Sequence, residues 1–451
     1  MYRITLLTLI ALATVQNGFS RIIPAVATAT AKDPVICRIE FDRAVLIADT
    51  PQKAVMKVAL QTPEVPSEKE RPPVNLSIVL DRSGSMGGDK IVKAREAAIE
   101  ALRRLGPNDI FSLIAFDDQI ETVVPAQPAV NTEWIESRIR AIQPRGSTAL
   151  FAGVSQGATE IRKNIEDRGY VSRIILLSDG QANVGPSSPH ELGRLGAALM
   201  KEGVSVSTVG VGTDYNEDLM TRLSQQSDGN SYFVASSSDL PRIFKAELGS
   251  VLTVVARKVI IEIVCDDGVK PVRIIGREGR IHNNRVELAL NQLYGGQEKF
   301  ALVEVEIPAS RVDEERSIAL ASCRYVDAIS TREQTASARG TMRFSRDKEI
   351  VTQSVNRDVA REVGLNEAAA VMDRAIELND AGKRDEAEKL MKAESQRVRQ
   401  VAKDYNIVEL EEQANDIATQ ADLMGSRQLD SVERKSMRTK NFQLRNQQMQ
   451  K

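Results

Sequence analysis

Long apolar runs alternate with helix-patterned segments through the middle of the chain. The apolar runs have the length and composition of strands buried on both faces, and they lie at 75–81, 110–116, 119–124, 171–179, 203–211 and 230–235. Apolar residues recur at helical spacing between them, at 88–105, 131–141, 149–165, 189–202, 215–227 and 238–249. Strands that alternate with helices predict a doubly wound, Rossmann-like α/β fold with a mostly parallel sheet.

One connection in this region departs from that alternation. Only Asp117-Asp118 separates strand 110–116 from strand 119–124, which predicts a tight turn and one antiparallel edge strand. The two carboxylates leave two interpretations open, a plain β-turn or a second cation site.

The segments that flank the α/β region have a different pattern. Short strand-like runs follow it at 259–264, 271–275, 285–290, 300–307 and 318–325, which is typical of an antiparallel β-sandwich. Two similar runs precede it, at 37–46 and 54–60. We expect these early runs to join the later sheet, so that the α/β domain is an insertion in a β domain. Both connections would then leave the α/β domain opposite the carboxyl ends of its strands.

The last hundred residues have helical periodicity and then lose it. A helical hairpin is predicted over 355–424, with Gly382 ending the first helix and Asp385 capping the second. Residues 425–451 are basic and glutamine-rich with few apolar positions, which indicates a solvated tail or a frayed helix.

These patterns divide the chain into six parts. They are a signal peptide and leader at 1–31, early strands with a linker at 32–71, the α/β domain at 72–250, the β domain at 251–350, the helical hairpin at 351–424 and the basic tail at 425–451.

Composition adds limits on location and partners. The 451 residues carry a net charge of only -2, so electrostatics give no reason to expect binding to nucleic acid or to an anionic membrane. Met1 to Val15 has a basic start and a short apolar stretch, which predicts a signal peptide and export to the periplasm, the cell envelope or the medium. Cleavage is expected after Ser20 or within 25–31; an uncleaved anchor is the alternative and would be the one route to a membrane.

Three cysteines are present, at Cys37, Cys265 and Cys323. An odd number leaves at least one thiol unpaired within the molecule. Cys265 and Cys323 lie in strand-like segments, and the sequence leaves open whether they form a bridge or are buried free thiols.

Side-chain oxygens gather where two of the buried strands end. Asp81, Ser83 and Ser85 follow the first strand, and Asp179 ends the strand at 171–179. Thr148 precedes a helix between them. In an open α/β sheet the carboxyl edge is where ligands bind, and these oxygens suit a hard cation such as Mg²⁺.

The pattern D-x-S-x-S, then T, then D resembles the metal-ion-dependent adhesion site of von Willebrand factor A domains. All five positions match in order, at Asp81, Ser83, Ser85, Thr148 and Asp179. The resemblance covers residues 72 to 250, and the layout is loosely similar to bacterial proteins related to inter-alpha-trypsin inhibitor heavy chains. It implies that the serines and Thr148 coordinate Mg²⁺ and that the two aspartates hold its water ligands. It also implies that a shift of helix 238–249 accompanies binding.

The ligand set predicts binding to a protein rather than catalysis. Mg²⁺ takes six oxygens, and Mn²⁺ or Ca²⁺ are alternatives at such a site. An open position would accept a carboxylate from a partner protein, as the resemblance also implies. Specificity is expected from the nearby loops, at 86–90, 117–118, 143–147, 181–188 and 213–216. Asp89 and Lys90 are interpreted as a solvent-facing helix start.

Other functions remain open. The D-x-S-G-S loop could be only a capped turn. A metal-dependent hydrolase needs a general acid or base, yet Ser83 replaces the second carboxylate, and the two histidines, His190 and His282, are expected on the surface. An envelope scaffold, with the α/β domain packed within its own assembly and its metal site filled by an internal acid, is the third alternative.

Overall fold

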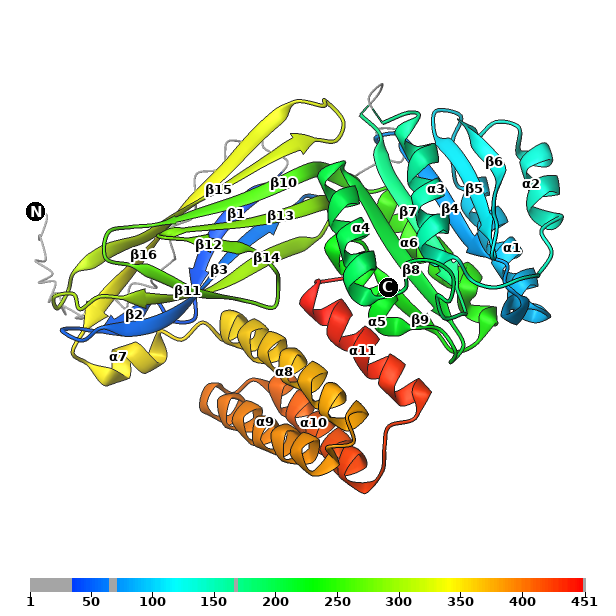
Figure 1. Cartoon of the computed structure of the whole chain (residues 1–451). Coiled ribbons are helices and arrows are strands. Elements are labelled where there is room, and N and C mark those ends of the chain that lie inside the picture. The colour runs from blue at the N-terminus through cyan, green and yellow to red at the C-terminus, as the bar shows by residue number, and fades with distance from the viewer. Residues whose placement is uncertain (1–34, 65–70, 166–168, 449–451) are drawn as a thin grey trace, which may run out of the picture.

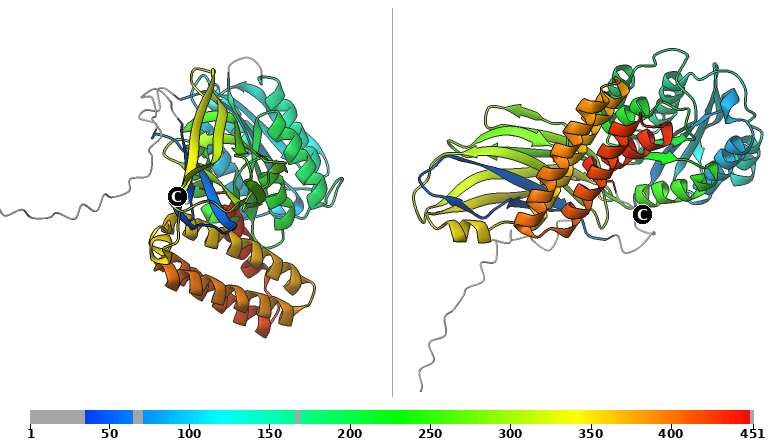
Figure 2. Two further views of the ribbon diagram at one scale, coloured as in Figure 1. Left: turned by 90° about the vertical axis from the view of Figure 1, so that its left-hand side faces the viewer. Right: turned by 90° about the horizontal axis from the view of Figure 1, so that it is seen from below.

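A computed structural model describes residues 35–64, 71–165 and 169–448 of the chain. Three parts lie side by side in it, an α/β domain, a β-sandwich and a set of C-terminal helices below both (Figure 1). Figure 2 shows that the helices cross the junction between the other two parts. The signal peptide and leader predicted at 1–31, and residues 65–70 of the linker expected at the end of the segment 32–71, fall outside the described residues.

The α/β domain contains a six-stranded sheet in the order β6-β5-β4-β7-β8-β9. Every neighbouring pair is parallel except β5 and β6, which are antiparallel around Asp117 and Asp118 as the sequence predicts. All residues of β4, β7 and β8 are buried, which explains the apolar runs of β4 and β7 and leaves only small polar side chains between the valines of β8. The strands are β4 (Val74–Asp81), β5 (Ile110–Phe116), β6 (Ile120–Pro128), β7 (Val171–Ser178), β8 (Val204–Val211) and β9 (Ser231–Val234).

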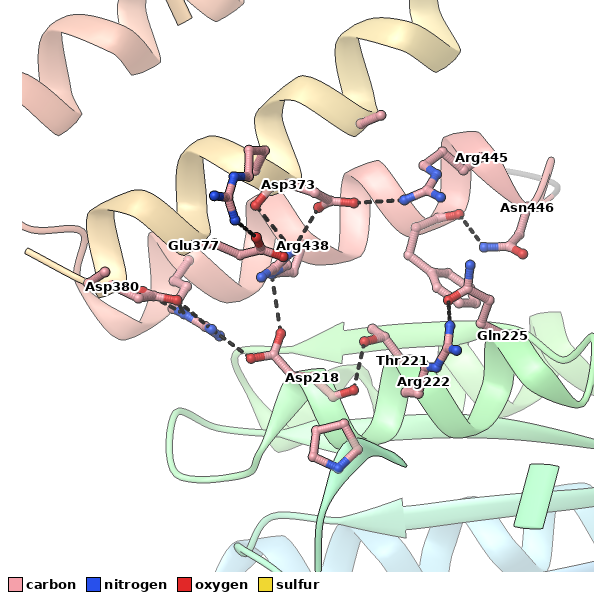
Figure 3. Close-up of a pocket in the computed structure, with 16 residues that line it drawn as sticks. Asp218, Thr221, Arg222, Gln225, Asp373, Glu377, Asp380, Arg438, Arg445 and Asn446 are labelled. Atoms are coloured by element: carbon pink, nitrogen blue, oxygen red, sulfur yellow. Dashed lines mark hydrogen bonds and ion pairs between the residues drawn. The ribbon is translucent and has the colours of Figure 1, made fainter. Parts of the chain in front are cut away.

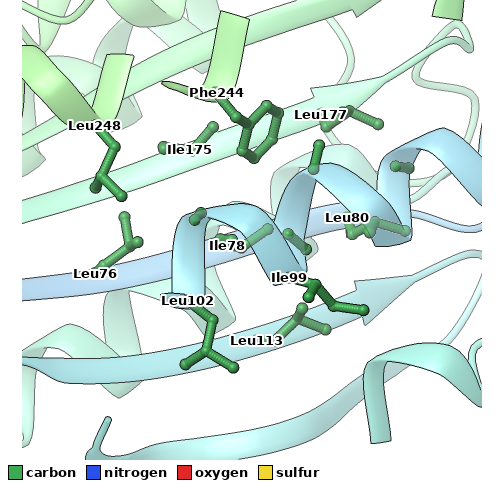
Figure 4. Close-up of a cluster of buried hydrophobic side chains, with 14 of the residues drawn as sticks. Leu76, Ile78, Leu80, Ile99, Leu102, Leu113, Ile175, Leu177, Phe244 and Leu248 are labelled. Atoms are coloured by element: carbon green, nitrogen blue, oxygen red, sulfur yellow. The ribbon is translucent and has the colours of Figure 1, made fainter. Parts of the chain in front are cut away.

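Helices cover both faces of this sheet. On one face, Phe244 and Leu248 of α6 pack with Leu102 of α1 against Leu76 of β4 and Ile175 of β7 (Figure 4). The other face is covered by α3, α4 and α5. The helices are α1 (Asp89–Arg103), α2 (Thr132–Arg140), α3 (Leu150–Arg162), α4 (Pro189–Lys201), α5 (Glu217–Gln226) and α6 (Leu240–Val251). The doubly wound α/β fold predicted from the sequence is confirmed.

Two further sheets form the β-sandwich, and strands from before and after the α/β domain share them. Their orders are β1-β3-β14-β11 and β12-β13-β10-β15-β16-β2. Apolar residues of both sheets form one core between them. The α/β domain is therefore inserted in the sandwich, as expected. The strands are β1 (Ile36–Phe41), β2 (Val45–Ile47), β3 (Gln52–Gln61), β10 (Val254–Cys265), β11 (Lys270–Ile275), β12 (Arg280–His282), β13 (Arg285–Tyr294), β14 (Glu298–Ile307), β15 (Glu315–Asp327) and β16 (Glu333–Ser345).

The run 37–46 is not one strand. It divides at Asp42 into β1 and β2, which pair in different sheets. Asp42 donates its backbone N–H to the carbonyl of Val55 at 2.9 Å, and its Oδ1 accepts from the Val55 N–H at 3.0 Å. These bonds to the neighbouring strand turn the chain where apolar alternation alone predicted continuity. After this turn β2 pairs with β16 in parallel, whereas the other strand pairs described in the two sandwich sheets are antiparallel.

Three long helices follow where the sequence predicts a hairpin of two. They are α8 (Arg357–Asp380), α9 (Arg384–Tyr405) and α10 (Val408–Ser426), preceded by the short α7 (Lys348–Gln353). Met372, Met391 and Leu410 share their core. Gly382 follows α8 with a φ of +77°, in agreement with its predicted role. Asp385 is not the cap of α9, because it lies inside the first turn.

Residues 425–448 of the basic tail are folded, so the prediction of a solvated or frayed segment is wrong for this part of it. Helix α11 (Ser431–Arg445) begins with a capping box formed by Asp430 and Glu433. It lies between α8 and the α/β domain (Figure 1). Lys435 is buried against Glu217, with an Nζ–Oε2 distance of 2.5 Å, and donates to the carbonyl oxygen of Tyr215 at 2.9 Å. Basic residues of the tail can thus be buried because acidic residues of other elements pair with them, whereas the sequence alone predicts that they face solvent.

A cavity of about 810 Å³ lies between α5, α8 and α11. Arginines and carboxylates line it and pair with each other, as Asp218 and Asp373 do with Arg438 (Figure 3). These ion pairs join the tail to the α/β domain.

A buried charged network joins the α/β domain to the sandwich. Arg173 of β7 is fully buried and donates to Gln292 of β13 at 2.6 Å and to the Tyr294 hydroxyl. Its guanidinium lies 3.4 Å from Glu247 of α6, which is also fully buried. Nearby, Lys299 of β14 pairs with Asp228, and burial lowers the pKa of Lys299 to about 8.

Two sequence questions are answered by the described residues. Cys37, Cys265 and Cys323 are all free thiols buried in the sandwich core, and burial raises the pKa of each. None of the helices in the described ranges has the length and apolar character needed to span a bilayer.

Candidate functional site

Asp81 ends β4 at the carboxyl edge of the parallel sheet, with its side chain completely buried. Its Oδ1 accepts a hydrogen bond from the backbone N–H of Ser83 at 2.8 Å. Its Oδ2 accepts from the hydroxyl of Ser178, the last residue of β7, at 2.5 Å. The carboxylate is therefore held between the two central strands of the sheet, β4 and β7.

The two serines of the motif connect the end of β4 to the end of β7. The Oγ atoms of Ser83 and Ser85 lie 3.1 Å apart. Ser85 in turn donates to Oδ1 of Asp179 at 2.8 Å. These contacts form because a short 3₁₀ turn, η2 (Gly84–Met86), directs the loop after β4 over the sheet edge.

Thr148 lies across from these residues, just before α3. Its backbone N–H donates to Oδ1 of Asn183 at 2.9 Å, and its carbonyl oxygen accepts from the Asn183 N–H at 3.2 Å. A Cβ added to Gly180 would lie 2.9 Å from Oγ1 of Thr148 and 3.6 Å from Oδ2 of Asp81. The threonine hydroxyl thus lies beside the buried aspartate, in space that a glycine leaves open. All five residues singled out in the sequence meet at one place.

The site holds two buried carboxylates. Burial is the main cause that raises the pKa of Asp81 to about 6, and hydrogen bonds from Ser178 and Ser83 oppose it. The charge of Asp179 raises the pKa of Asp81 further. Two adjacent buried carboxylates repel each other, so a cation bound beside them would stabilise the site.

Lys90 supplies part of this positive charge, a role that the sequence pattern did not predict. We expected Asp89 and Lys90 to start a helix on solvent, and Asp89 is indeed exposed. Lys90 instead points its Nζ to Oδ2 of Asp179, whose side chain has no exposed surface. No local signal reveals this pair, because the partners are 89 residues apart. Only the fold brings the start of α1 next to the end of β7.

Asp117 and Asp118 behave differently from each other. Asp117 is buried and accepts from Nε of Arg82 at 2.9 Å and from Nε of Arg145 at 2.8 Å. Burial alone would raise the pKa of Asp117, but hydrogen bonds and the charge of Arg82 outweigh it and hold the pKa below its ordinary value. Two arginines thus take the place that a second cation would need at Asp117. Gly146 passes so close to Asp118 that an added Cβ would lie 2.0 Å from its Oδ1.

The donor set fits a hard divalent cation. Within the described ranges no group of three or more His, Cys, Asp or Glu residues is placed to hold a metal ion. The site combines two carboxylates with three hydroxyls, and oxygen-only sets of this kind suit Mg²⁺ and similar ions. The assignment of these side chains as metal ligands stays a prediction. His190 and His282 are both exposed, as expected.

Comparisons with known proteins agree with this geometry. The model of the von Willebrand factor type A domain matches residues 75–246. The uncharacterized protein YfbK of Escherichia coli is 28% identical over 232 residues, which are 51% of this chain and 40% of YfbK. Human inter-alpha-trypsin inhibitor heavy chain H4 is 32% identical over 175 residues, or 37% of this chain and 19% of the heavy chain. This chain therefore spans less than half the length of these curated relatives.

The fold similarity extends beyond that domain. A von Willebrand factor type A protein from Catenulispora acidiphila superposes with a TM-score of 0.67 at 16% identity, covering 84% of this chain and 89% of that one. At this identity the superposition shows a shared fold and nothing further. The sequence match and the shared fold together establish that residues 75–246 are a von Willebrand factor type A domain.

Proposed function

We propose that this chain binds a partner protein through a divalent cation held at the carboxyl edge of its von Willebrand factor type A domain. Domains of this family generally mediate metal-dependent protein interactions. The observation that carries the proposal is the meeting of Asp81, Ser83, Ser85, Thr148 and Asp179 at one sheet edge, with both carboxylates buried.

The cation would compensate the negative charge of Asp81 and Asp179, which Lys90 compensates only in part. In this proposal Ser83, Ser85 and Thr148 bind it through their hydroxyls, while Asp81 and Asp179 hold its water ligands. Mg²⁺ is the expected ion because it requires six oxygens and retains water readily. Mn²⁺ and Ca²⁺ share the preference for oxygen and are the alternatives.

The partner is expected to supply a carboxylate. Neutral hydroxyls leave the cation electron-poor, so an acidic side chain is the natural incoming ligand. The loop 213–216, which follows β8, already contacts another part of the chain, because Lys435 of α11 donates to the carbonyl oxygen of Tyr215. The partner would therefore approach over the loops that follow β4, β5 and β7.

A binding role fits the site better than catalysis. The Ser85 hydroxyl donates to Asp179, and its described hydrogen-bond partners include neither of the exposed histidines, His190 and His282. A hydrolase would need a general base or acid beside the reacting group. We therefore propose a non-enzymatic protein.

The scaffold alternative rests on the packing of α11 and the sandwich against the domain. The hydrogen bonds that the structure gives the five site residues all come from residues 81–183, so no described acid of the tail is bound there. This favours a site that faces an external partner. We also propose that the protein is exported, on the basis of the leader at 1–31 alone.

The test is calorimetric titration of the full chain with Mg²⁺ and Mn²⁺. The wild type should bind one equivalent, and an Asp81→Ala, Ser83→Ala double variant should bind none. Asp89→Asn is the matched control, since it removes an exposed carboxylate from the start of α1, close to the motif in sequence, and should bind as the wild type does. Equal binding by all three proteins, or no binding by the wild type, would reject the proposed site.

A further inference from the structure

Lys90 is placed where a cation is least favoured by its own helix. It is the second residue of α1, a helix of 15 residues, and its side chain is 29% exposed. The positive end of the helix dipole lies at this terminus and repels an ammonium group. An attractive partner is needed to hold Lys90 inward, and Asp179 is that partner.

The space around Lys90 is formed by the ends of two strands. Asp179 follows β7, and Gly212 follows β8 with a φ of +72°. A Cβ at Gly212 would lie 3.6 Å from Nζ of Lys90. The lysine therefore lies across the carboxyl ends of β7 and β8, directly beside the acid that also accepts from Ser85.

Asp179 cannot keep its ion pair with Lys90 and also hold a divalent cation. One of its oxygens accepts from Ser85 and the other from Lys90, so both are engaged when no metal is present. A divalent cation held near Asp179 would repel the ammonium group. The lysine side chain has a flexible four-carbon stem and is partly exposed, so it has a route to solvent.

We propose that Lys90 is an internal counter-cation that compensates Asp179 in the metal-free site and must leave when the metal binds. The inference rests on the proposed function, because it concerns the same site. Lys90 then sets the metal affinity: part of the binding free energy of the cation is spent on breaking the Lys90–Asp179 ion pair. It also keeps the metal-free domain folded by preventing an isolated buried charge.

The experiment compares charge-removing and charge-keeping variants of the full chain. Lys90→Met removes the ammonium group but keeps most of the side-chain volume, and Lys90→Arg keeps the charge. The matched control is Lys93→Met, one turn further along the same helix, where the lysine side chain is 37% exposed and pairs with Glu96 of the same helix. Calorimetry with Mg²⁺ and with Mn²⁺ gives the dissociation constant for each variant.

Lys90→Met should bind either cation about tenfold more tightly than the wild type, which corresponds to about 1.4 kcal/mol. Lys90→Arg and Lys93→Met should stay close to the wild type. A second readout is thermal unfolding with EDTA and with Mg²⁺. Lys90→Met should unfold at a lower temperature than the wild type in EDTA. Mg²⁺ should raise its unfolding temperature by more than it raises that of the wild type, because the metal then supplies the missing positive charge.

The outcomes separate this inference from the proposed function. If the wild type binds metal and Lys90→Met binds with equal or lower affinity, the role of Lys90 is rejected while the metal site stands. If no variant binds either cation, the proposed function fails and this inference fails with it. Should Lys90→Met not fold, Lys90→Gln replaces it and must show the same gain in affinity.

Discussion

Arg173 should be the most sensitive charged residue at the junction of the two domains. We consider Arg173→Met, which keeps an unbranched chain but removes a fully buried guanidinium. The change deletes hydrogen bonds to Ser207 at 3.0 Å and to Gln292 at 2.6 Å, and leaves Glu247 without its ion-pair partner. The interface then contains an unpaired buried carboxylate.

The magnitude follows from that isolated charge. Breaking a buried pair by removing one partner costs about 3–5 kcal/mol. Glu247 still accepts from Asn230 and from Tyr232, each at 2.8 Å, so the lower part of that range is expected. At about 2–4 °C per kcal/mol for a domain of this size, the unfolding midpoint should fall by at least about 6 °C.

The assay is differential scanning calorimetry of the full chain beside a matched control. Arg162→Met breaks an exposed pair with Glu202, whose Nε–Oε2 distance is 2.7 Å, and should cost less than about 1 kcal/mol. Adding Glu247→Gln to Arg173→Met should recover part of the loss, because the unpaired charge is then gone. The reasoning is refuted if Arg173→Met shifts the midpoint no more than Arg162→Met does.

Three further predictions concern the site and the tail. Folding raises the pKa of Asp81 from 3.8 to about 6, so the stability that its protonated form contributes is present at acidic pH and is lost as the pH rises through about 6. Asp81→Asn should therefore stabilise the metal-free chain at pH 7 by about 1–3 kcal/mol in urea unfolding. A lower free energy of unfolding for this variant at pH 7 would contradict the prediction. Glu217→Gln should release α11, because Lys435 is buried against that carboxylate, and hydrogen exchange should rise in α11 alone; unchanged exchange would show that other contacts hold the helix. Gly180→Ala should displace the Thr148 hydroxyl, which an added Cβ would approach to 2.9 Å, and should weaken Mg²⁺ binding in calorimetry with little change in the unfolding midpoint; wild-type affinity would argue against a ligand role for that hydroxyl.

The α/β domain was largely predictable because its strands are buried on both faces. Continuous apolar runs such as β4 and β7 have no competing interpretation when helices lie between them. The motif residues were predictable for a related reason, since the carboxyl ends of parallel strands meet at one edge. Long-range polar contacts left no such pattern in the sequence.

Three features show what sequence periodicity cannot supply. Lys90 and Arg173 are charged residues whose partners lie far away along the chain, so their burial depends on the completed fold. Helix α11 has few apolar positions, and acids of α5 and α8 compensate its charges. The break at Asp42 comes from a side chain that bonds to a neighbouring strand. The shift of α6 that the family resemblance implies stays a prediction.

The central claim is that the sheet edge holds a cation with a position open to an incoming ligand. Water-proton relaxation of the full chain with Mn²⁺ tests both parts, because a bound paramagnetic ion enhances relaxation only if exchangeable water reaches it. We predict clear enhancement in the wild type and its loss in the Asp81→Ala, Ser83→Ala variant. Enhancement that is absent from the wild type, or unchanged in the variant, would contradict the account.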